Sequence, residues 1–257
     1  MNRAVVRWAA VAAVLFVFFL LLTVPARHAW GWLGGGQLAV QGIEGTLWSG
    51  RVAHLANPAH PVFPVGPLAW HVRPQALLLG RLEYQVFVQS GTGGGELRVG
   101  RGLFGGASVT AAHLSVPAAD LAQGLHLNLL TLAGEFQIDI DELRLSADGS
   151  GALPSVLEGV LVWRDARVVQ PSPLSLGQLR MQLGLREGQV VGALSDEGEG
   201  GSLELSGELS IGADRQYRLD ALLKPRATAD APLREALGLL GAPDAQGRYR
   251  LQYSGAL

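Results

Sequence analysis

The chain of 257 residues contains no cysteine, a single lysine (Lys224) and few charged residues overall. Without cysteine it can form neither disulfides nor thiolate metal sites, and an oxidising compartment does it no harm. Charged residues make up 16% of the sequence and the formal net charge is −2. The chain therefore lacks the basic surface that nucleic-acid binding requires. Its 48% of hydrophobic residues is enough for one large folded domain or two small ones.

Glycine is the residue in excess, with 35 of the 257 positions. This is nearly double the usual fraction of about 7%. The glycines are spaced through hydrophobic segments, a distribution that suits many short strands joined by tight turns better than long helices.

An uncharged apolar run from Trp8 to Val24 predicts a transmembrane helix. Its 17 residues are near the lower limit for crossing a hydrocarbon core of about 30 Å. Arg3 and Arg7 precede the run, which predicts a cytoplasmic N-terminus by the positive-inside rule. The large side chains expected to form the anchor are Trp8, Phe16, Phe18, Phe19, Leu20, Leu21 and Leu22.

A cleaved signal peptide is the competing interpretation of this run. The run is longer and bulkier than the usual apolar region of about 7 to 15 residues in such peptides. The segment 26–29 also lacks the small–any–small spacing of a cleavage site, and Trp30 and Trp32 suit an interfacial anchor. We therefore expect a single-pass inner-membrane protein with a cytoplasmic tail (1–7), a helix (8–24), a linker (25–36) and a periplasmic domain (37–257).

Alternation of apolar and polar residues is the main pattern after residue 36, and it is typical of strands with one face on a core and one in water. In one such segment Phe136, Ile138 and Ile140 alternate with polar residues. The segments with this pattern are 82–89, 135–145, 178–185, 202–209 and 248–253. Turn signals separate them, at 93–95, 148–149, 187–188, 197–201 and 212–214.

The predicted fold is therefore mainly β: a large curled antiparallel sheet, forming an open barrel or a groove, with one or two short helices. A parallel α/β sheet would need long helices between its strands, and the chain does not supply them. One helix is predicted after the capping residue Asp230, with Leu233 and Leu237 on its apolar stripe and its end at Gly241. A shorter helical turn is expected at 118–121. A proline-rich loop is expected at 57–67, and a break near 146–154 divides the domain into two similar halves.

Three segments together resemble the type II secretion system protein N family. The first, 40–52, carries a glycine–threonine–hydrophobic–tryptophan–x–glycine motif. The second, 68–82, carries a Trp–x–hydrophobic–x–Pro strand followed by Leu–Leu–x–Gly, and the third spans 239–251 near the C-terminus. The motif residues, expected to be structural, are Gly45, Thr46, Trp48, Gly50, Trp70, Pro74, Gly241 and Pro243. We expect Gly45 and Gly50 to bracket a strand, and Trp48 and Trp70 to be packing residues.

The resemblance implies an inner-membrane subunit of the machine that exports folded proteins across the outer membrane. Its partners would be other inner-membrane and periplasmic subunits of that machine, and it implies no catalytic activity. A second hypothesis is a periplasmic bridging protein that binds lipid or another hydrophobic molecule in an apolar groove. This layout is known in periplasmic lipid carriers, so the second hypothesis rests on analogy of fold.

The sequence contains no convincing catalytic, cofactor or metal site. The Gly-x-Gly-x-x-Gly sequence at 100–105 precedes a predicted strand, whereas a dinucleotide site needs a helix there, so we predict a glycine-rich turn. Ser49 lacks the glycine frame of a hydrolase nucleophile. The histidines show no metal-ligand spacing, and Asp139 and Asp141 fit the polar face of a strand better than a calcium loop. We therefore predict a protein that is not an enzyme and holds no cofactor or metal.

Overall fold

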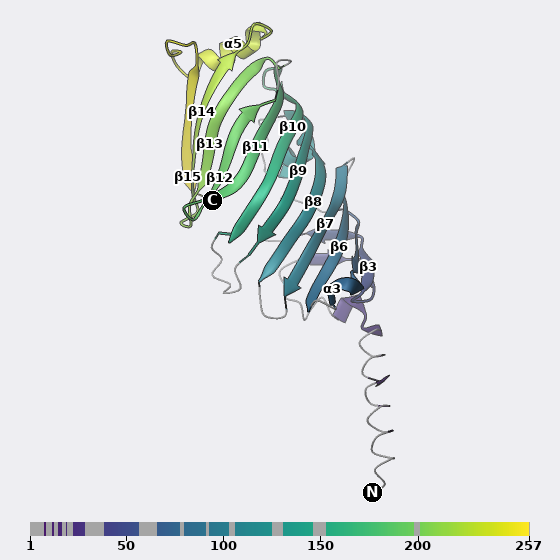
Figure 1. Cartoon of the computed structure of the whole chain (residues 1–257). Helices are drawn as coiled ribbons and strands as arrows, with labels where there is room; N and C mark the ends of the chain where they lie inside the picture. The colour runs from purple at the N-terminus through teal and green to yellow at the C-terminus, as the bar shows by residue number, and fades with distance from the viewer. Residues whose placement is uncertain are drawn as a thin grey trace.

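The computed structural model describes residues 8, 12, 15, 16, 19, 23–28, 39–56, 66–77, 80–90, 93–102, 106–124, 131–145, 153–197 and 201–256. Strands predominate in these residues (Figure 1). The strands are β1 Ala39–Gln41, β2 Glu44–Gly45, β3 Ser49–Val52, β4 His54–Ala56, β5 Leu68–Val72, β6 Arg81–Ser90, β7 Gly93–Gly102, β8 Ala107–Pro117, β9 Thr131–Arg144, β10 Val156–Gln170, β11 Leu174–Arg186, β12 Gln189–Asp196, β13 Leu203–Ile211, β14 Gln216–Pro225 and β15 Tyr249–Ala256. The short helices are α3 Pro74–Leu77, α4 Ala118–Gly124 and α5 Ala231–Gly238.

Thirteen strands form one antiparallel sheet, in the order β15-β14-β13-β12-β11-β10-β9-β8-β7-β6-β5-β3-β2. From β5 onward each strand pairs with the next one along the chain, so the sheet is an up-and-down meander. The sheet is open, with β2 at one edge and β15 at the other. β1 and β4 pair separately as a two-stranded sheet.

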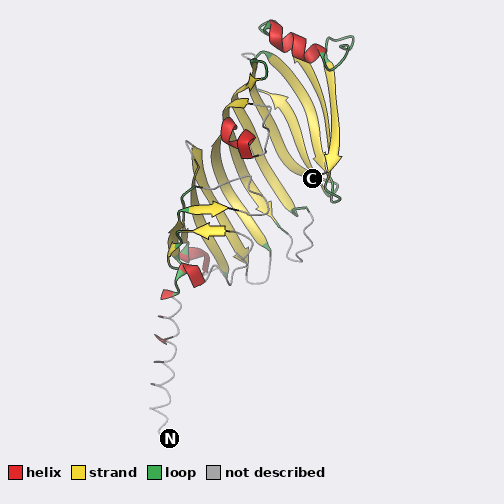
Figure 2. Cartoon of the chain, turned by 180° about the vertical axis from the view of Figure 1, so that it is seen from behind, coloured by secondary structure: helices red, strands yellow, loops and turns green. Residues whose placement is uncertain are grey.

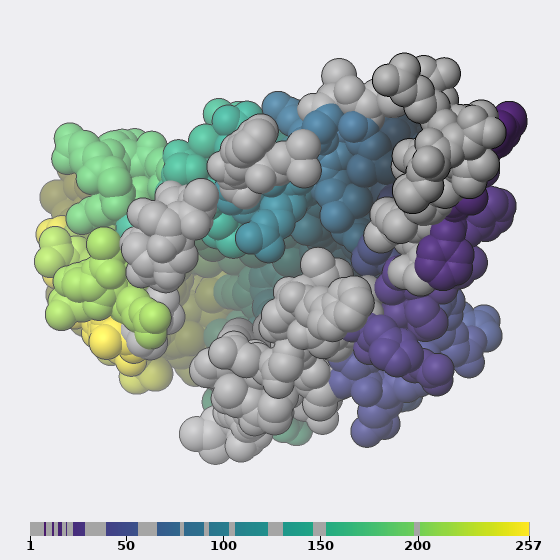
Figure 3. Space-filling view, turned by 90° about the horizontal axis from the view of Figure 1, so that it is seen from below, coloured from purple at the N-terminus to yellow at the C-terminus, as the bar shows by residue number. Residues whose placement is uncertain are grey.

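The two faces of the large sheet differ in polarity. Residues directly opposite each other on neighbouring antiparallel strands share a face, so the register identifies each face. The face that carries Val88, Ile138 and Leu161 is apolar, and we call it the inner face. Figure 2 shows that β1 and β4, α4 and α5 all lie on this side of the sheet. In Figure 3 the sheet curls around a hollow on the same side, between the C-terminal strands and the N-terminal segment.

The alternating segments are strands as predicted: they fall within, or overlap almost completely with, β6, β9, β11, β13 and β15. The turn expected at 93–95 is wrong, because these glycines begin β7. Gly100 and Gly102 are also in β7 rather than in a turn, while 103–105 lie outside the described residues. The physical reason is close packing of strands: a Cβ atom on Gly95 would lie 2.0 Å from the carbonyl oxygen of His113 on β8.

Both predicted helices are confirmed, as α5 and α4. The side chain of Asp230 caps α5 by accepting a hydrogen bond from the Leu233 backbone nitrogen at 3.0 Å. The proline-rich loop at 57–65 and the break at 146–152 lie outside the described residues. β9 and β10, on either side of that break, pair directly, so one continuous sheet joins the two parts of the domain.

Most of the predicted span 8–24 lies outside the described residues, including Phe18, Leu20, Leu21 and Leu22. Its described members Trp8, Ala12, Leu15, Phe16, Phe19 and Thr23 are helical and exposed, whereas Val24 is non-helical and half-buried. Within the described part of the chain, we find no helix with the length and apolar character needed to span a membrane.

Candidate functional site

The first motif folds as a tight hairpin between β2 and β3. The Thr46 backbone nitrogen donates to the Ser49 carbonyl oxygen at 2.8 Å. The Thr46 hydroxyl oxygen accepts from the backbone nitrogens of Trp48 at 3.2 Å and Ser49 at 3.3 Å. The expectation that Gly45 and Gly50 bracket a strand is therefore wrong: they lie opposite each other across the hairpin, with the turn between them.

The hairpin fastens the N-terminal segment to the sheet. The Leu47 backbone nitrogen donates to the Val24 carbonyl oxygen at 3.0 Å, and Pro25 forms an isolated β-bridge with Thr46. On the other side, the Val72 backbone nitrogen donates to the Trp48 carbonyl oxygen at 2.7 Å. The segment that follows the predicted membrane span is thus hydrogen-bonded directly to the first strands of the sheet.

The remaining motif residues lie at both ends of the sheet. Trp48 and Trp70 are half-buried near the N-terminal edge, and Gly50 lies directly opposite Trp70. Pro74 is the first residue of α3, just after β5. Gly241 and Pro243 are exposed in the connection between α5 and β15, at the opposite end of the molecule (Figure 1). The motif residues therefore do not converge on a single site.

A continuous apolar row crosses the inner face from β3 to β15. Successive partners in register are Val52, Leu68, Val88, Gly95, Leu114, Ile138, Leu161, Met181, Leu194, Gly207, Ala221 and Leu251. Val52 on β3 and Ala221 on β14 are buried, but the central side chains from Leu114 to Leu194 are only half-buried. The inner face is therefore an apolar surface whose central part is incompletely covered.

Helix α5 covers the C-terminal part of this face. Leu233 and Leu237 pack with Leu203 and Ala229 in the main buried cluster. Beside this cluster an ion pair joins Arg226 to Asp196, which also accepts a hydrogen bond from the Leu205 backbone nitrogen at 2.9 Å. Removing either partner would leave a charge in a largely apolar surrounding, so this pair ties the segment before α5 to the sheet.

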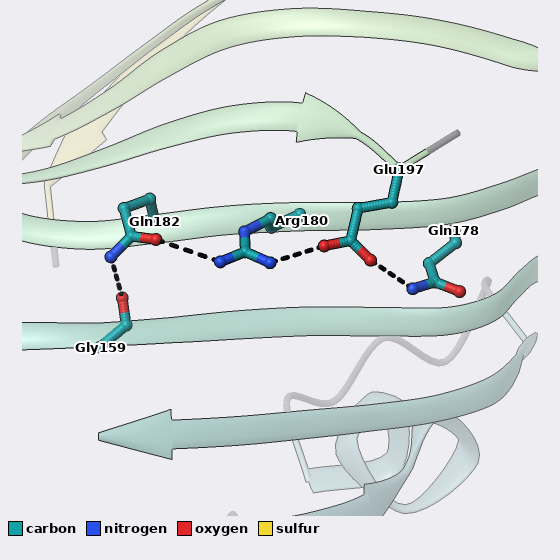
Figure 4. Close-up of polar contacts among 5 residues, drawn as sticks. All are labelled: Gly159, Gln178, Arg180, Gln182 and Glu197. Atoms are coloured by element: carbon teal, nitrogen blue, oxygen red, sulfur yellow. Dashed lines mark hydrogen bonds and ion pairs between the residues drawn. The ribbon is translucent and has the colours of Figure 1, made fainter. Parts of the chain in front are cut away.

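The outer face is polar and carries cross-strand networks, one of which is shown in Figure 4. Arg180 on β11 donates to Glu197 at 2.6 Å and to Gln182 at 3.4 Å. Gln182 in turn donates to the Gly159 carbonyl oxygen on β10 at 3.1 Å, and Gln178 also contacts Glu197. The hydrogen bond from Arg180 holds the pKa of the Glu197 carboxyl below its usual value.

This network predicts a pH-dependent effect of Glu197→Gln. A carboxyl whose pKa is lowered on folding stabilises the fold above its unfolded pKa, and this contribution is lost as the pH falls through the folded pKa. We expect the variant to lower the urea midpoint at pH 7 and to change it little near pH 3. The matched control is Glu187→Gln, in the exposed turn after β11. An equal cost at both pH values would contradict the role of the charged carboxylate.

Several of the residues considered for a hydrolase nucleophile or a metal site are exposed in the structure. Ser49 is exposed in the hairpin, and His113 and Asp139 form an exposed cross-strand pair at 2.7 Å on the outer face. Among the described residues, no group of three or more His, Cys, Asp or Glu side chains is arranged to hold a metal ion. The ion pairs of the outer face, including Asp220 with Arg250, could not be predicted from the sequence, because only the strand register brings such residues together.

The described structure is an extended open sheet with one polar face, one apolar face and two edges. Comparison with known proteins identifies the family to which such a sheet belongs here. A family model for type II secretion system (T2SS) protein N matches residues 36–252. The type II secretion system protein N of Aeromonas hydrophila is 30% identical over 263 residues, which cover 97% of each chain.

The type II secretion system protein N of Vibrio cholerae serotype O1 is 32% identical over 228 residues, covering 86% of this chain and 85% of that protein. The chain belongs to the type II secretion system protein N family. Its place is therefore among the components of a type II secretion system. No solved structure matches the chain.

Proposed function

We propose that the chain is a single-pass inner-membrane subunit of the type II secretion system that supports export of folded proteins through protein–protein contacts. The observation that carries this proposal is the family match over residues 36–252. In the proposed topology the N-terminus (1–7) is cytoplasmic, residues 8–24 cross the membrane, and 37–257 form the periplasmic domain.

The proposed anchor is supported by the side chains of its described residues. Trp8, Phe16 and Phe19 are 74%, 68% and 62% exposed, which is costly in water and favourable in lipid. The hydrogen bond between Val24 and Leu47 would then hold the sheet against the periplasmic surface of the membrane. The short hairpin connection would leave the domain little freedom to move away from the bilayer.

A detergent pull-down of the tagged chain at native expression level tests the proposed function. Mass spectrometry of the recovered proteins and lipids reports both kinds of partner. We expect other subunits of the secretion machine at stoichiometric yield, without stoichiometric lipid. Recovery of no such subunit, under conditions in which the machine stays assembled, would overturn the proposal.

A charge within the proposed anchor should release the protein from the membrane. Arginine near the centre of a membrane helix costs about 2.5–3.5 kcal/mol on insertion scales. We therefore expect Phe16→Arg to move the chain into the soluble fraction or to cause its degradation. The control is His28→Arg, outside the proposed span, which should stay in the membrane pellet. Normal membrane retention of Phe16→Arg would contradict a single anchor at 8–24.

Lipid or hydrophobic-molecule bridging is the second candidate function, and the apolar inner row favours it. Side chains such as Leu114, Ile138 and Leu161 are half-buried, so an acyl chain lying along the row would remove further apolar surface from water. The row begins at β3, beside the proposed membrane attachment. Stoichiometric phospholipid in the pull-down, with no secretion subunit, would favour this candidate over the first.

A further inference from the structure

The two edges of the large sheet are protected to different degrees. At the N-terminal edge, β2 has only two residues. Just beyond β2, Thr46 forms a β-bridge with Pro25, and the Leu47 backbone nitrogen donates a hydrogen bond to the Val24 carbonyl oxygen. The chain itself thus covers this edge where β2 ends in the hairpin turn. At the opposite edge, β15 has eight residues and, among the described strands, only β14 as a neighbour. An open sheet edge presents unpaired backbone donors and acceptors, so the β15 edge is available for pairing.

β15 lacks most of the usual devices that block an edge, and its one charged side chain is Arg250. All eight residues pair with β14 in a register without a shift, so the strand contains no bulge. Its sequence contains no proline, no lysine and no acidic residue. Short edge strands, bulges, prolines and outward lysines are the means by which proteins prevent edge-to-edge association.

The polar side chains of β15 are held away from its open edge. Arg250 on β15 donates through Nε to Asp220 on β14 at 3.1 Å, and through Nη2 at 2.5 Å. Gln252 also donates to Asp220, at 2.9 Å. Just before the strand, Arg248 turns back to Asp244 at 2.8 Å. These contacts point the long side chains toward the sheet or the preceding loop, and the edge backbone stays clear.

We propose that β15 is a docking edge that accepts an extended segment of another protein as an additional antiparallel or parallel strand. This inference rests on the proposed function for the orientation of the chain and names the surface through which it makes one of its contacts. Main-chain hydrogen bonds would supply much of the binding energy, as in other cases of strand addition.

A second copy of the chain does not fit this edge. Figure 1 shows β15 running from the top to the bottom of the view, with the described N-terminal residues 23–28 below the sheet. Antiparallel pairing of two β15 strands about an axis perpendicular to the sheet would invert one copy. The two N-terminal segments would then point in opposite directions and could not enter one membrane. Parallel pairing about an axis along the strands would place the apolar face of one copy beside the polar face of the other.

The chemistry of the edge defines the expected partner segment. Tyr249, Leu251 and Tyr253 lie on the inner face, and Tyr253 is 60% exposed although its ring lies beside Tyr217. The partner strand should therefore carry apolar or aromatic residues at alternate positions on that face. On the outer face, Arg218 lies opposite Ser254 and makes no ion pair within the described part of the chain. An acidic residue of the partner near Ser254 would complement it.

Single-cysteine crosslinking tests the docking edge, because the natural chain contains no cysteine. Ser254→Cys places a thiol on β15, and the matched control Ser206→Cys places one on the same face of β13, two strands inside the sheet. Both serines are exposed. Each full-length variant is labelled in native membranes with a benzophenone maleimide, irradiated and analysed by mass spectrometry. We expect a discrete adduct with another protein from Ser254→Cys, at a yield roughly tenfold or more above that of the control.

The outcomes separate this inference from the proposed function. Absence of an adduct at Ser254→Cys, equal adducts at both positions, or an adduct of two copies of the chain would each overturn the docking edge. The pull-down is scored independently, so secretion subunits recovered without a β15 adduct would leave the proposed function standing and refute only this surface. Ser254→Glu, which places a negative charge beside the acidic residue expected in the partner, should abolish the adduct formed from a neighbouring Gln252→Cys, and persistence of that adduct would also refute strand addition.

Discussion

Replacing Gly50 with alanine should destabilise the folded domain by about 1–3 kcal/mol, the usual cost of inserting a methyl group where there is no space. A Cβ atom on Gly50 would lie 2.4 Å from the Glu44 carbonyl oxygen and 2.5 Å from Cζ2 of Trp70. One obstacle is backbone and the other is a large half-buried ring, so neither can move without disturbing its strand. Urea unfolding of the full chain in detergent, followed by tryptophan fluorescence, measures the change.

Gly184→Ala is the matched control for this substitution. Gly184 lies in β11 of the same sheet, and the nearest heavy atom to a Cβ atom there is the Leu157 carbonyl oxygen at 4.0 Å. We expect the control to change the free energy of unfolding by less than about 0.5 kcal/mol. Equal effects at the two positions would mean that Gly50 is not required for close packing of the hairpin. The family motif would then need an explanation other than architecture.

The strand content of this fold could be predicted because alternation records which face of a strand is buried. Phe136, Ile138 and Ile140 of β9 gave a clear period of two, and all three lie on the inner face as that period requires. β7 was missed because glycines at its two ends resemble turns when contacts between strands are unknown. The bulge in β9 opposite Glu158 and Gly159 is likewise invisible in a pattern of single residues.

The interaction surfaces could be predicted only in part, because they depend on register and on strand order. The apolar row joins residues from Val52 to Leu251, which are almost 200 positions apart in the sequence. The open edge at β15 follows from the order of thirteen strands, and no local sequence motif predicts it. The motif glycines were found by resemblance, but their opposition across a hairpin became clear only from the pairing of β2 with β3.

Leu233→Ala should destabilise the C-terminal part of the sheet by about 2–5 kcal/mol, the range for truncating a large buried aliphatic side chain. The side chain of Leu233, in α5, is only 2% exposed and packs with Leu203 and Ala229 between the helix and the sheet. Loss of this contact leaves a cavity between the helix and the sheet, so α5 should detach before the remaining strands unfold. Urea unfolding gives the free-energy change, and amide hydrogen exchange in α5 and β13 locates it.

Leu239→Ala provides the matched control, since Leu239 ends the same helix but is 89% exposed. Its removal should change the free energy of unfolding by less than about 0.5 kcal/mol and leave exchange in β13 unaltered. A cost for Leu233→Ala no greater than that of the control would contradict the packing of α5 on the inner face. A large cost confined to α5 and the neighbouring strands would instead establish the helix as the cover of this end of the apolar row. The central side chains from Leu114 to Leu194 would then be the part of the row left for a ligand.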